Sequence, residues 1–527
     1  MPTLEWIGKD KVINHHLDVP YRVLERKYSY DEGGQHEGDN GSENMIIHGD
    51  NLDALKSLLP RYEGRIKCIY IDPPYNTGNE KWVYNDNVND PRIKAWLGNV
   101  VGAEGEDLSR HDKWLCMMYP RLKLLQRLLS ENGVIFISID DSELANLKLI
   151  CDEIFGKNNF VETIVWQKRT SPDARKRVSS GHEYVLIYAK SVERGDDIFN
   201  LLELEGKDAD KFKNPDNDPK GPWVSTDFTA QGWRPNQMYE ITTPSGIKMT
   251  PPEGRCWRHL ESVYIQLLED GRLWFGSDGN GVPRKKTYLY EKEGKGVWTW
   301  WTNAEVGHTQ EATQELATYL GKAVFDYPKP VRLIKRILSL ASSSGDVILD
   351  SFAGSGTTAH AVLNMNKADG GHRRFILVEM MDYADSITAE RVKRVIHGYG
   401  AGKQAAEGTG GSFSYYELGE PLMNGDNLNE EVGIDKIREY VFFTETKCRL
   451  PEAHGDEPYY LGEHANNAYY FYYERSQVTT LNRDFLRTVK TKADGYVIYA
   501  DLCTLSEEER ERHHITFKKI PRDITKL

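Results

Sequence analysis

The sequence predicts an α/β fold with a doubly wound, mostly parallel sheet. Two observations lead to this prediction. Short apolar runs, typical of strands buried on both faces, alternate with amphipathic helical stretches from residue 45 to about 190 and again from about 311 to 396. Several of these runs end directly in a carboxylate or a small-residue turn, and open α/β folds bind ligands at the carboxyl edge of the sheet.

The elements follow one another in the order that such a sheet requires. Apolar runs that suit strands are separated by runs with helical spacing, and Asn132-Gly133 separates the longest helix from the next strand. Acids at 140–143 open a further helix, where the helix dipole favours them. We predict strands at 46–47, 66–71, 134–139, 347–350 and 374–378, and helices at 52–59, 114–129 and 359–367.

The rest of the chain departs from this alternation. Residues 191–309 are rich in Gly, Pro and Trp, so we predict a separate β-rich insertion. The polar stretch at 76–112 is a long loop, and loops of this length are usually functional or disordered. The predicted segments are an N-terminal arm and linker (1–44), a first α/β half (45–190), the insertion (191–310), a second α/β half (311–411) and a small α/β C-terminal domain (412–527).

The tetrapeptide Asp72-Pro73-Pro74-Tyr75 directly follows the predicted strand 66–71. The two prolines end the strand and stiffen the loop, so a carboxylate and an aromatic ring are held at the carboxyl edge of the sheet. A stiff loop loses little entropy when a planar ligand binds. The alternative is an ordinary strand end, with Asp72 as a cap.

A second motif begins at Asp350, where another strand leads into the small-residue turn 351–358 and a helix. Strand, turn and helix amino terminus bring backbone N–H groups close to a ligand. The phosphate-loop pattern and the six-residue dinucleotide fingerprint are both absent from this turn. Glu379 ends the next strand, where a carboxylate suits a ribose diol. The motif predicts a nucleoside site without pyrophosphate, which S-adenosylmethionine fits; the alternative is a turn that only packs helix on strand.

Together the two motifs resemble those of the amino-methylating DNA methyltransferases, which transfer a methyl group from S-adenosylmethionine to an exocyclic nitrogen of a base. Residues 72–78 resemble the catalytic motif of that family, and residues 350–358 resemble its cofactor motif, with Ser351 where Pro is commoner. The catalytic motif comes first, as in the β class, where a recognition segment lies between the two. The length and the tail at 515–521 resemble the modification subunit of type III restriction systems. The resemblance implies a Rossmann-like methyltransferase fold.

Other segments fit the same resemblance. Residues 47–52 resemble the segment whose Asp meets the adenine of the cofactor, residues 325–330 resemble the segment leading into the cofactor half, and Tyr84-Asn85-Asp86 and His182-Glu183-Tyr184 recur in such enzymes. The resemblance implies catalytic roles for Asp72, Pro73, Pro74, Tyr75 and Asn76. It implies cofactor binding by Asp50, Asn51, Lys329, Asp350, Phe352, Ala353, Gly354, Ser355, Gly356, Thr357, Thr358 and Glu379.

The implied chemistry is positioning of a weak nucleophile. Asp72 and the Pro73 carbonyl accept the two N–H groups of the target amine and turn its lone pair toward the methyl group. Tyr75 stacks on the base once it has left the duplex, Asn76 holds the loop or touches the base edge, and the loop 76–112 closes over the base. No metal is required. Asp at position 72, where cytosine-N4 enzymes of similar build often carry Ser, favours adenine N6; cytosine N4 is the alternative.

Basic residues gather in the middle of the chain, although the net charge is −13. Net charge does not set the field at a cleft, so DNA binding is compatible with it. We predict DNA contacts in this region, with four Trp residues interleaved; the alternative is a set of solvated faces. The candidate DNA-binding residues are Lys168, Arg169, Arg255, Arg258, Arg284, Lys285 and Lys286, and a further cluster is Arg175, Lys176 and Arg177. In the C-terminal domain, the aromatic run 469–473 suits a packed strand better than a surface for stacking bases.

Composition sets the remaining expectations. Six scattered cysteines without a CxxC pair argue against zinc and disulfides and suit a reducing cytosol. No run of 18 apolar residues and no signal peptide is present, so we expect a cytoplasmic protein without a membrane span. The expected partners are double-stranded DNA and, from the resemblance, a second copy of the chain.

Two rival functions stay open from the sequence, and a third is excluded. A glutamine-modifying methyltransferase shares a Pro-Pro-Tyr loop, but such enzymes usually begin it with Asn. A DNA-binding specificity subunit with little catalysis of its own is disfavoured by the intact motifs. A complete restriction enzyme is excluded, because the chain has neither a phosphate loop nor a convincing nuclease cluster, so any cleavage belongs to a separate helicase-nuclease subunit.

Overall fold

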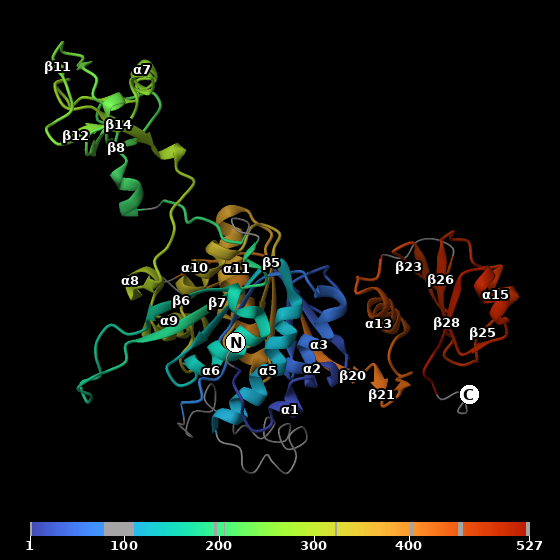
Figure 1. The fold of residues 1–527 in the computed structure, drawn as a ribbon. Coiled ribbons are helices and arrows are strands. Elements are labelled where there is room, and N and C mark those ends of the chain that lie inside the picture. Colours follow the sequence, from blue (N-terminus) through green and yellow to red (C-terminus); the bar gives the residue numbers. More distant parts are fainter. Residues whose placement is uncertain are drawn as a thin grey trace. The chain divides into compact units, whose positions relative to one another are not determined.

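The computed structural model describes residues 3–77, 110–193, 198–204, 206–321, 324–400, 405–451 and 457–522 (Figure 1). The predicted loop 76–112 lies mostly outside these residues, as does the segment Tyr84-Asn85-Asp86. The chain forms two compact units, one of Met1–Asn200 and Thr299–Leu527 and the other of Leu201–Trp298. The second unit lies within the insertion predicted at 191–310.

An eleven-stranded sheet is the centre of the first unit, in the order β15-β6-β7-β5-β4-β16-β17-β3-β20-β1-β2. All neighbouring strands from β5 to β20 run parallel, whereas β7 is antiparallel to both β5 and β6, and β1 is antiparallel to β20 and β2. The mostly parallel α/β fold is therefore confirmed. The strands are β1 (Arg22–Asp31), β2 (Gly34–His36), β3 (Met45–His48), β4 (Ile66–Ile71), β5 (Leu129–Ile139), β6 (Phe160–Gln167), β7 (His182–Ala189), β15 (Trp300–Trp301), β16 (Val347–Asp350), β17 (Arg374–Glu379) and β20 (Phe413–Pro421).

Helices pack in two groups around this sheet, and their apolar faces close the core. α5 contacts both α3 and α6 in one group, and α9 to α12 form the other, which also includes α8 (Figure 1). The strands β4 and β16 are almost wholly buried between them, as their continuous apolar sequences predict. The helices are α1 (Lys9–Val12), α2 (His15–Asp18), α3 (Asn51–Tyr62), α5 (Arg110–Leu128), α6 (Leu144–Cys151), α8 (Asn303–Val306), α9 (Thr309–Leu320), α10 (Val331–Ala341), α11 (Thr357–Asp369) and α12 (Glu390–His397).

The two sequence motifs meet at the middle of the sheet. β4 and β16 are neighbours, with Leu349 opposite Ile69 in the register. After β4 the chain next enters the sheet at β5 on one side, and after β16 it enters at β17 on the other side. The carboxyl ends of two such strands border a crevice, which is where open α/β folds bind ligands. Asp72 and Asp350 therefore stand on the two sides of one crevice.

Two predicted boundaries differ from the structure. Residues 1–44 are not only an arm and linker, because β1 and β2 extend the edge of the large sheet. The boundary at 412 separates β20 from the sheet to which it belongs, since β20 pairs with β3 and β1. β1 has few apolar residues and alternates irregularly, as an edge strand can, and this concealed it in the sequence.

The C-terminal segment carries a small α/β layer of its own. Its sheet has the order β23-β24-β26-β28, with β24, β26 and β28 parallel and β23 antiparallel to β24. The aromatic run forms β24 and its continuation, and Tyr470, Phe471 and Tyr473 are buried, so this run is a packed strand. The elements are β21 (Met423–Asn424), β22 (Asn427–Leu428), α13 (Ile434–Thr446), β23 (Tyr460–His464), β24 (Asn467–Phe471), β25 (Thr480–Leu481), α14 (Arg483–Leu486), β26 (Gly495–Ala500), β27 (Leu502–Cys503), α15 (Glu507–Arg512) and β28 (Ile515–Lys519).

The second unit is β-rich, as predicted. Its largest sheet has three strands in the order β13-β14-β8, and an aromatic cluster around Phe228 and Trp257 packs against α7. The elements are β8 (Trp223–Asp227), β9 (Thr229–Gln231), β10 (Ile241–Thr242), β11 (Lys248–Met249), β12 (Arg255–Trp257), α7 (Glu261–Glu269), β13 (Leu273–Trp274) and β14 (Arg284–Tyr288).

Candidate active site

The loop after β4 is held in place by hydrogen bonds to the rest of the first unit. The Trp114 indole donates a hydrogen bond to the Pro74 carbonyl at 2.6 Å. Asn76 has a left-handed backbone (φ 58°), which Asn tolerates better than most residues, and its side-chain amide donates to Glu143 and to the Arg110 carbonyl. Asn76 therefore holds the loop, which was one of its two predicted roles.

Both oxygens of the Asp72 carboxylate are occupied by donors from the chain. The Tyr75 hydroxyl donates to Oδ1 at 2.7 Å, and the Lys329 ammonium donates to Oδ2 at 2.5 Å. The Tyr75 hydroxyl also lies 3.1 Å from Oε2 of Glu183, and Lys168 donates to the other Glu183 oxygen at 2.7 Å. Lys329 is 3.7 Å from Glu183. Two lysines and two carboxylates thus form a neutral cluster around one tyrosine, which we call the catalytic cluster.

Neighbouring opposite charges favour the ionised forms of Lys329 and Glu183 in this cluster. Burial opposes ionisation of Lys329 and Glu183, but the surrounding charges outweigh it. Asp72 and Glu183 raise the pKa of the Lys329 ammonium, and Lys329 and Lys168 lower the pKa of the Glu183 carboxyl. Burial, followed by the two carboxylates, raises the pKa of Tyr75 well above its usual value, so this tyrosine is a neutral donor.

The opposite side of the crevice carries two more buried carboxylates. Asp350 accepts hydrogen bonds from the Phe352 N–H at 3.1 Å and the Thr358 hydroxyl at 2.6 Å. Glu379 accepts from the Gly354 N–H at 2.8 Å and the Met381 N–H at 3.0 Å. Burial raises the pKa of Asp350 and that of Glu379 to about 7 each. No lysine, arginine or histidine of the described chain lies within ion-pair distance of Asp350.

The turn between Asp350 and α11 depends on glycine. Gly354 and Gly356 both have positive φ angles, 54° and 79°, which L-residues rarely adopt. A Cβ on Gly356 would lie 3.1 Å from the Thr388 carbonyl. Gly356 is therefore needed for the turn and for packing against Thr388.

One cavity brings Asp72 together with most of the predicted cofactor-binding residues. Phe325, Tyr327 and Lys329 form one wall of it, and the strand ends form the other. It measures only about 30 Å³, so a nucleoside requires these walls to separate. Predicted residues that line it are Asp72, Lys329, Asp350, Phe352, Ala353, Gly354, Ser355, Thr357 and Thr358.

Other predicted residues stand behind this cavity. Asp50 caps α3 and pairs with Arg121 at 3.3 Å, and Asn51 donates to the Ser351 carbonyl at 3.1 Å. These two residues brace the turn and do not line the cavity. Glu379 acts on the turn through the Gly354 N–H.

A second cavity of about 530 Å³ adjoins the first. Phe325, Tyr327 and Lys329 line both, so this segment separates them. Lys168, Arg169 and Glu183 also line the larger cavity. Glu183 received no role from the sequence; a carboxylate within the otherwise apolar strand β7 was the signal that could have found it.

The predicted DNA-binding residues divide into several environments. Arg258 is exposed, Lys285 and Arg255 are half-buried, and Arg284 pairs with Asp227 at 2.7 Å. Lys286 is buried, donates to Asp216 and Asp218 at 2.5 Å each and lies over the Trp223 ring. The prediction that Lys286 contacts DNA is therefore wrong, because its charge is satisfied inside the second unit.

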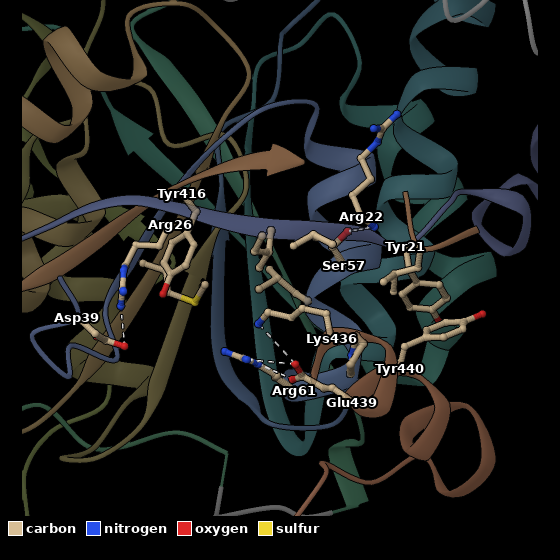
Figure 2. A pocket seen from close by; sticks show the side chains of 16 residues that line it. Tyr21, Arg22, Arg26, Asp39, Ser57, Arg61, Tyr416, Lys436, Glu439 and Tyr440 are labelled. Carbon is tan, nitrogen blue, oxygen red and sulfur yellow. Dashed lines mark hydrogen bonds and ion pairs between the residues drawn. The ribbon is translucent and has the colours of Figure 1, made fainter. Parts of the chain in front are cut away.

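A third cavity, of about 440 Å³, lies where α13 packs beside β1 and α3 (Figure 2). Its walls carry Arg26 and Arg61, whose guanidinium groups point at Asp39 and Glu439 (Figure 2). Tyr21 and Tyr440 are in ring contact at its rim. The paired charges make it a polar seam between packed elements, with little left to attract a charged ligand.

Among the residues that the structure describes, no group of three or more potential metal ligands occurs. None of the described helices has the length and apolar character needed to cross a membrane.

Comparison with known proteins places this geometry in a family. The family described as DNA methylase matches residues 66–390, which include both motifs. The StyLTI Mod subunit of a type III restriction-modification enzyme from Salmonella typhimurium is 37% identical over 72% of this chain and 61% of its own length. The type II methyltransferase M.KpnI from Klebsiella pneumoniae is 33% identical over 64% of this chain and 81% of its own.

The chain is also similar to a solved DNA methyltransferase structure, and it spans less than two thirds of the length of three relatives. The PvuII cytosine-N4-specific DNA methyltransferase superposes with a TM-score of 0.34 at 13% identity, covering 66% of this chain and 86% of its own. The chain spans 61%, 66% and 63% of the length of the StyLTI, EcoP15I and EcoPI Mod subunits that it matches.

Proposed function

Because the chain belongs to the DNA methylase family, we propose that it is a site-specific DNA methyltransferase that transfers a methyl group from S-adenosylmethionine to N6 of a flipped-out adenine. The observation that carries this proposal is that Asp72 and Asp350 stand at the carboxyl ends of two neighbouring strands. One offers an acceptor to an amine, and the other offers a buried negative charge to a cationic cofactor.

The residues of the second strand end fit this cofactor. S-adenosylmethionine supplies a methyl group on a positively charged sulfur when it is bound. The carboxylates of Asp350 and Glu379 are almost fully buried, and a nearby positive charge would stabilise their ionised forms. Phe352 lines the cavity where an aromatic ring can lie against the adenosine. The narrow cavity implies that the segment around Tyr327 moves outward when the cofactor enters.

The catalytic cluster provides the other half of the reaction. Asp72 accepts one N–H of the target amine, and the Pro73 carbonyl is the acceptor proposed for the second. Together they align the nitrogen lone pair with the methyl group, which is catalysis by positioning and electrostatics. The larger cavity beside Lys329 is where the extruded base is expected to enter, because flipped bases need a pocket next to the reacting groups.

Adenine is the proposed target because position 72 is Asp. A carboxylate accepts a hydrogen bond from an amine strongly, and a Ser in that position is the pattern of similar cytosine-N4 enzymes. Sequence reading is proposed for the second unit, whose Arg258 and Lys285 are available to phosphate or bases.

The names of the relatives suggest the biological setting. We include in the proposal that the chain is the modification subunit of a type III restriction-modification system, acts on double-stranded DNA in the cytoplasm, forms homodimers and works with a separate restriction subunit. Co-purification of the chain with a helicase-nuclease polypeptide from the same cells tests whether it works with a separate restriction subunit.

The decisive experiment is single-molecule methylation sequencing of DNA from cells that express the chain. We expect N6-methyladenine at one sequence motif, and its absence with Asp72→Ala. Asp270→Ala, which changes an exposed carboxylate after α7, is the matched control and should leave the motif methylated. Methylation on cytosine, or marks that persist with Asp72→Ala, would overturn the proposal.

A further inference from the structure

Lys329 occupies an unusual place between the two cavities. It precedes Pro330, the N-cap of α10, and its carbonyl accepts a hydrogen bond from the Thr357 hydroxyl at 3.2 Å. The backbone is thus fixed to the cofactor turn. The side chain is only 8% exposed and reaches across to Asp72, so Lys329 joins the two motif halves.

The Lys329 ammonium makes the contact that the proposed substrate needs. Asp72 Oδ1 faces the Tyr75 hydroxyl, so we assign the incoming amine to Oδ2. Lys329 presents an N–H donor to that oxygen at 2.5 Å and lies 5.1 Å from the centre of the Tyr75 ring. A base stacked on Tyr75 with its amine on Asp72 would need the same space. The ammonium and the target amine therefore exclude each other.

A second acceptor for the ammonium stands beside the first. Oε2 of Glu183 is 3.7 Å from the Lys329 nitrogen, so a shift of about 1 Å brings it to hydrogen-bond distance. Glu183 is buried and faces Lys168 and Tyr75 as well as Lys329. Leaving Asp72 for Glu183 keeps the lysine charge paired, which matters because an unpaired buried charge is costly.

We infer that Lys329 is a positioning residue that occupies the amine-binding oxygen of Asp72 while no base is bound, and that it passes to Glu183 when the target amine arrives. This inference rests on the proposed function. It gives the Asp72 carboxylate a partner of opposite charge between turnovers. It also predicts that the target amine contributes little to binding, since each amine contact replaces a lysine contact.

The experiment compares duplexes that differ only in the target amine. One carries adenine in the methylated motif found by sequencing, and the other carries purine, which lacks the 6-amino group. Fluorescence anisotropy gives both dissociation constants with S-adenosylhomocysteine present. Each protein is judged by the ratio of its two constants, so an inactive fraction cancels.

We expect wild-type protein to bind the two duplexes within about threefold of each other, since one contact replaces another. The double variant Lys329→Met/Glu183→Gln removes one charge of each sign and keeps the cluster neutral. In it the amine gains an open acceptor, and adenine should be preferred about tenfold or more, the usual value of a hydrogen bond to a charged group. Lys367→Met is the matched control: it removes an exposed lysine of α11 that pairs with Glu407 and is not part of the catalytic cluster, so its ratio should stay at the wild-type value.

A pH–rate profile separates this role from a merely structural one. Lys329→Met alone leaves Asp72 and Glu183 with one lysine between them, so the loss of methylation rate on the acidic side of the profile should move to higher pH. Adding Glu183→Gln should return this acidic limb toward its wild-type position. Equal adenine-to-purine ratios in the wild type and the double variant would overturn the inference. An inactive wild-type protein would instead refute the proposed function.

Discussion

Cofactor affinity should rise with pH, and the buried carboxylates fix by how much. Burial raises the pKa of Asp350 to about 7, so this group is mostly protonated in the free protein below that pH. A cationic ligand beside it favours the ionised form, so binding expels a proton wherever the group was protonated. Between pH 6 and pH 8 the ionised fraction of one such group rises about tenfold, which is about 1.4 kcal/mol of binding free energy.

Glu379 doubles the effect, because burial raises its pKa to about 7 as well. If both groups must ionise, the dissociation constant for S-adenosylmethionine should fall by up to about a hundredfold between pH 6 and pH 8. Asp350→Asn should weaken binding at pH 8 and reduce the slope to that of one group. The amino group of the ligand titrates equally in both proteins, so the difference between the slopes belongs to Asp350.

Isothermal calorimetry provides the assay. Titrations at pH 6.5, a value chosen below both pKa values, in two buffers of different ionisation enthalpy count the protons released on binding. We expect about one proton fewer from Asp350→Asn than from the wild type. Wild-type affinity that stays flat across this range, without a buffer-dependent heat, would refute the claim that these carboxylates are protonated in the free protein.

Three further predictions follow from the same contacts. Asp72→Ala should lower the methylation rate by about a hundredfold or more, roughly 3 kcal/mol, and leave S-adenosylmethionine binding within a few-fold by calorimetry; near-normal turnover would contradict the role of Asp72. Lys286→Met should destabilise the second unit by about 1–3 kcal/mol in thermal unfolding, because it leaves Asp216 and Asp218 without their shared donor, and Lys285→Met should not. Neutralising Arg258 and Lys285 together should reduce the salt dependence of DNA binding by about two phosphate contacts, with an unchanged slope counting against their position in the interface.

The strand ends that we propose as the reacting centre could be predicted from the sequence because their signals are local. An apolar strand that ends in Asp72, and another that ends in Asp350, each indicate a sheet edge without any knowledge of the rest of the fold. That β4 and β16 are neighbours was not predicted from the sequence, because strand order is a long-range property; it is found in the sheet of the structure. The site was predictable where backbone pattern and side-chain chemistry coincide within a few residues.

Long-range pairs were not predictable in the same way. Lys329 and Asp72 are 257 positions apart, and no periodicity connects them. Lys286 is a different case, because its strand did carry a signal. It alternates with Lys285 and shares a face of β14 with the buried Tyr288, so the period of two places it inward. The run of three basic residues was interpreted as one surface, although a strand divides such a run between two faces.

The distribution of charge explains why Lys329 can serve as a reversible occupant of Asp72. The catalytic cluster is neutral by itself, whereas no lysine, arginine or histidine among the described residues forms an ion pair with Asp350. The negative charge of Asp72 contributes to raising the pKa of Asp350, so the two sides interact electrostatically. A positive cofactor beside Asp350 should therefore weaken the hold of Lys329 on Asp72, and the same coupling must favour cofactor binding when the target amine is in place. Once the cofactor no longer carries a positive charge, Lys329 again binds Asp72 more strongly than the amine does, which favours release of the methylated base.

Binding of the adenine duplex should accordingly be tighter with a positively charged cofactor analogue than with S-adenosylhomocysteine. The double variant Lys329→Met/Glu183→Gln should lose that difference. An equal difference in both proteins would show that the coupling does not pass through Lys329.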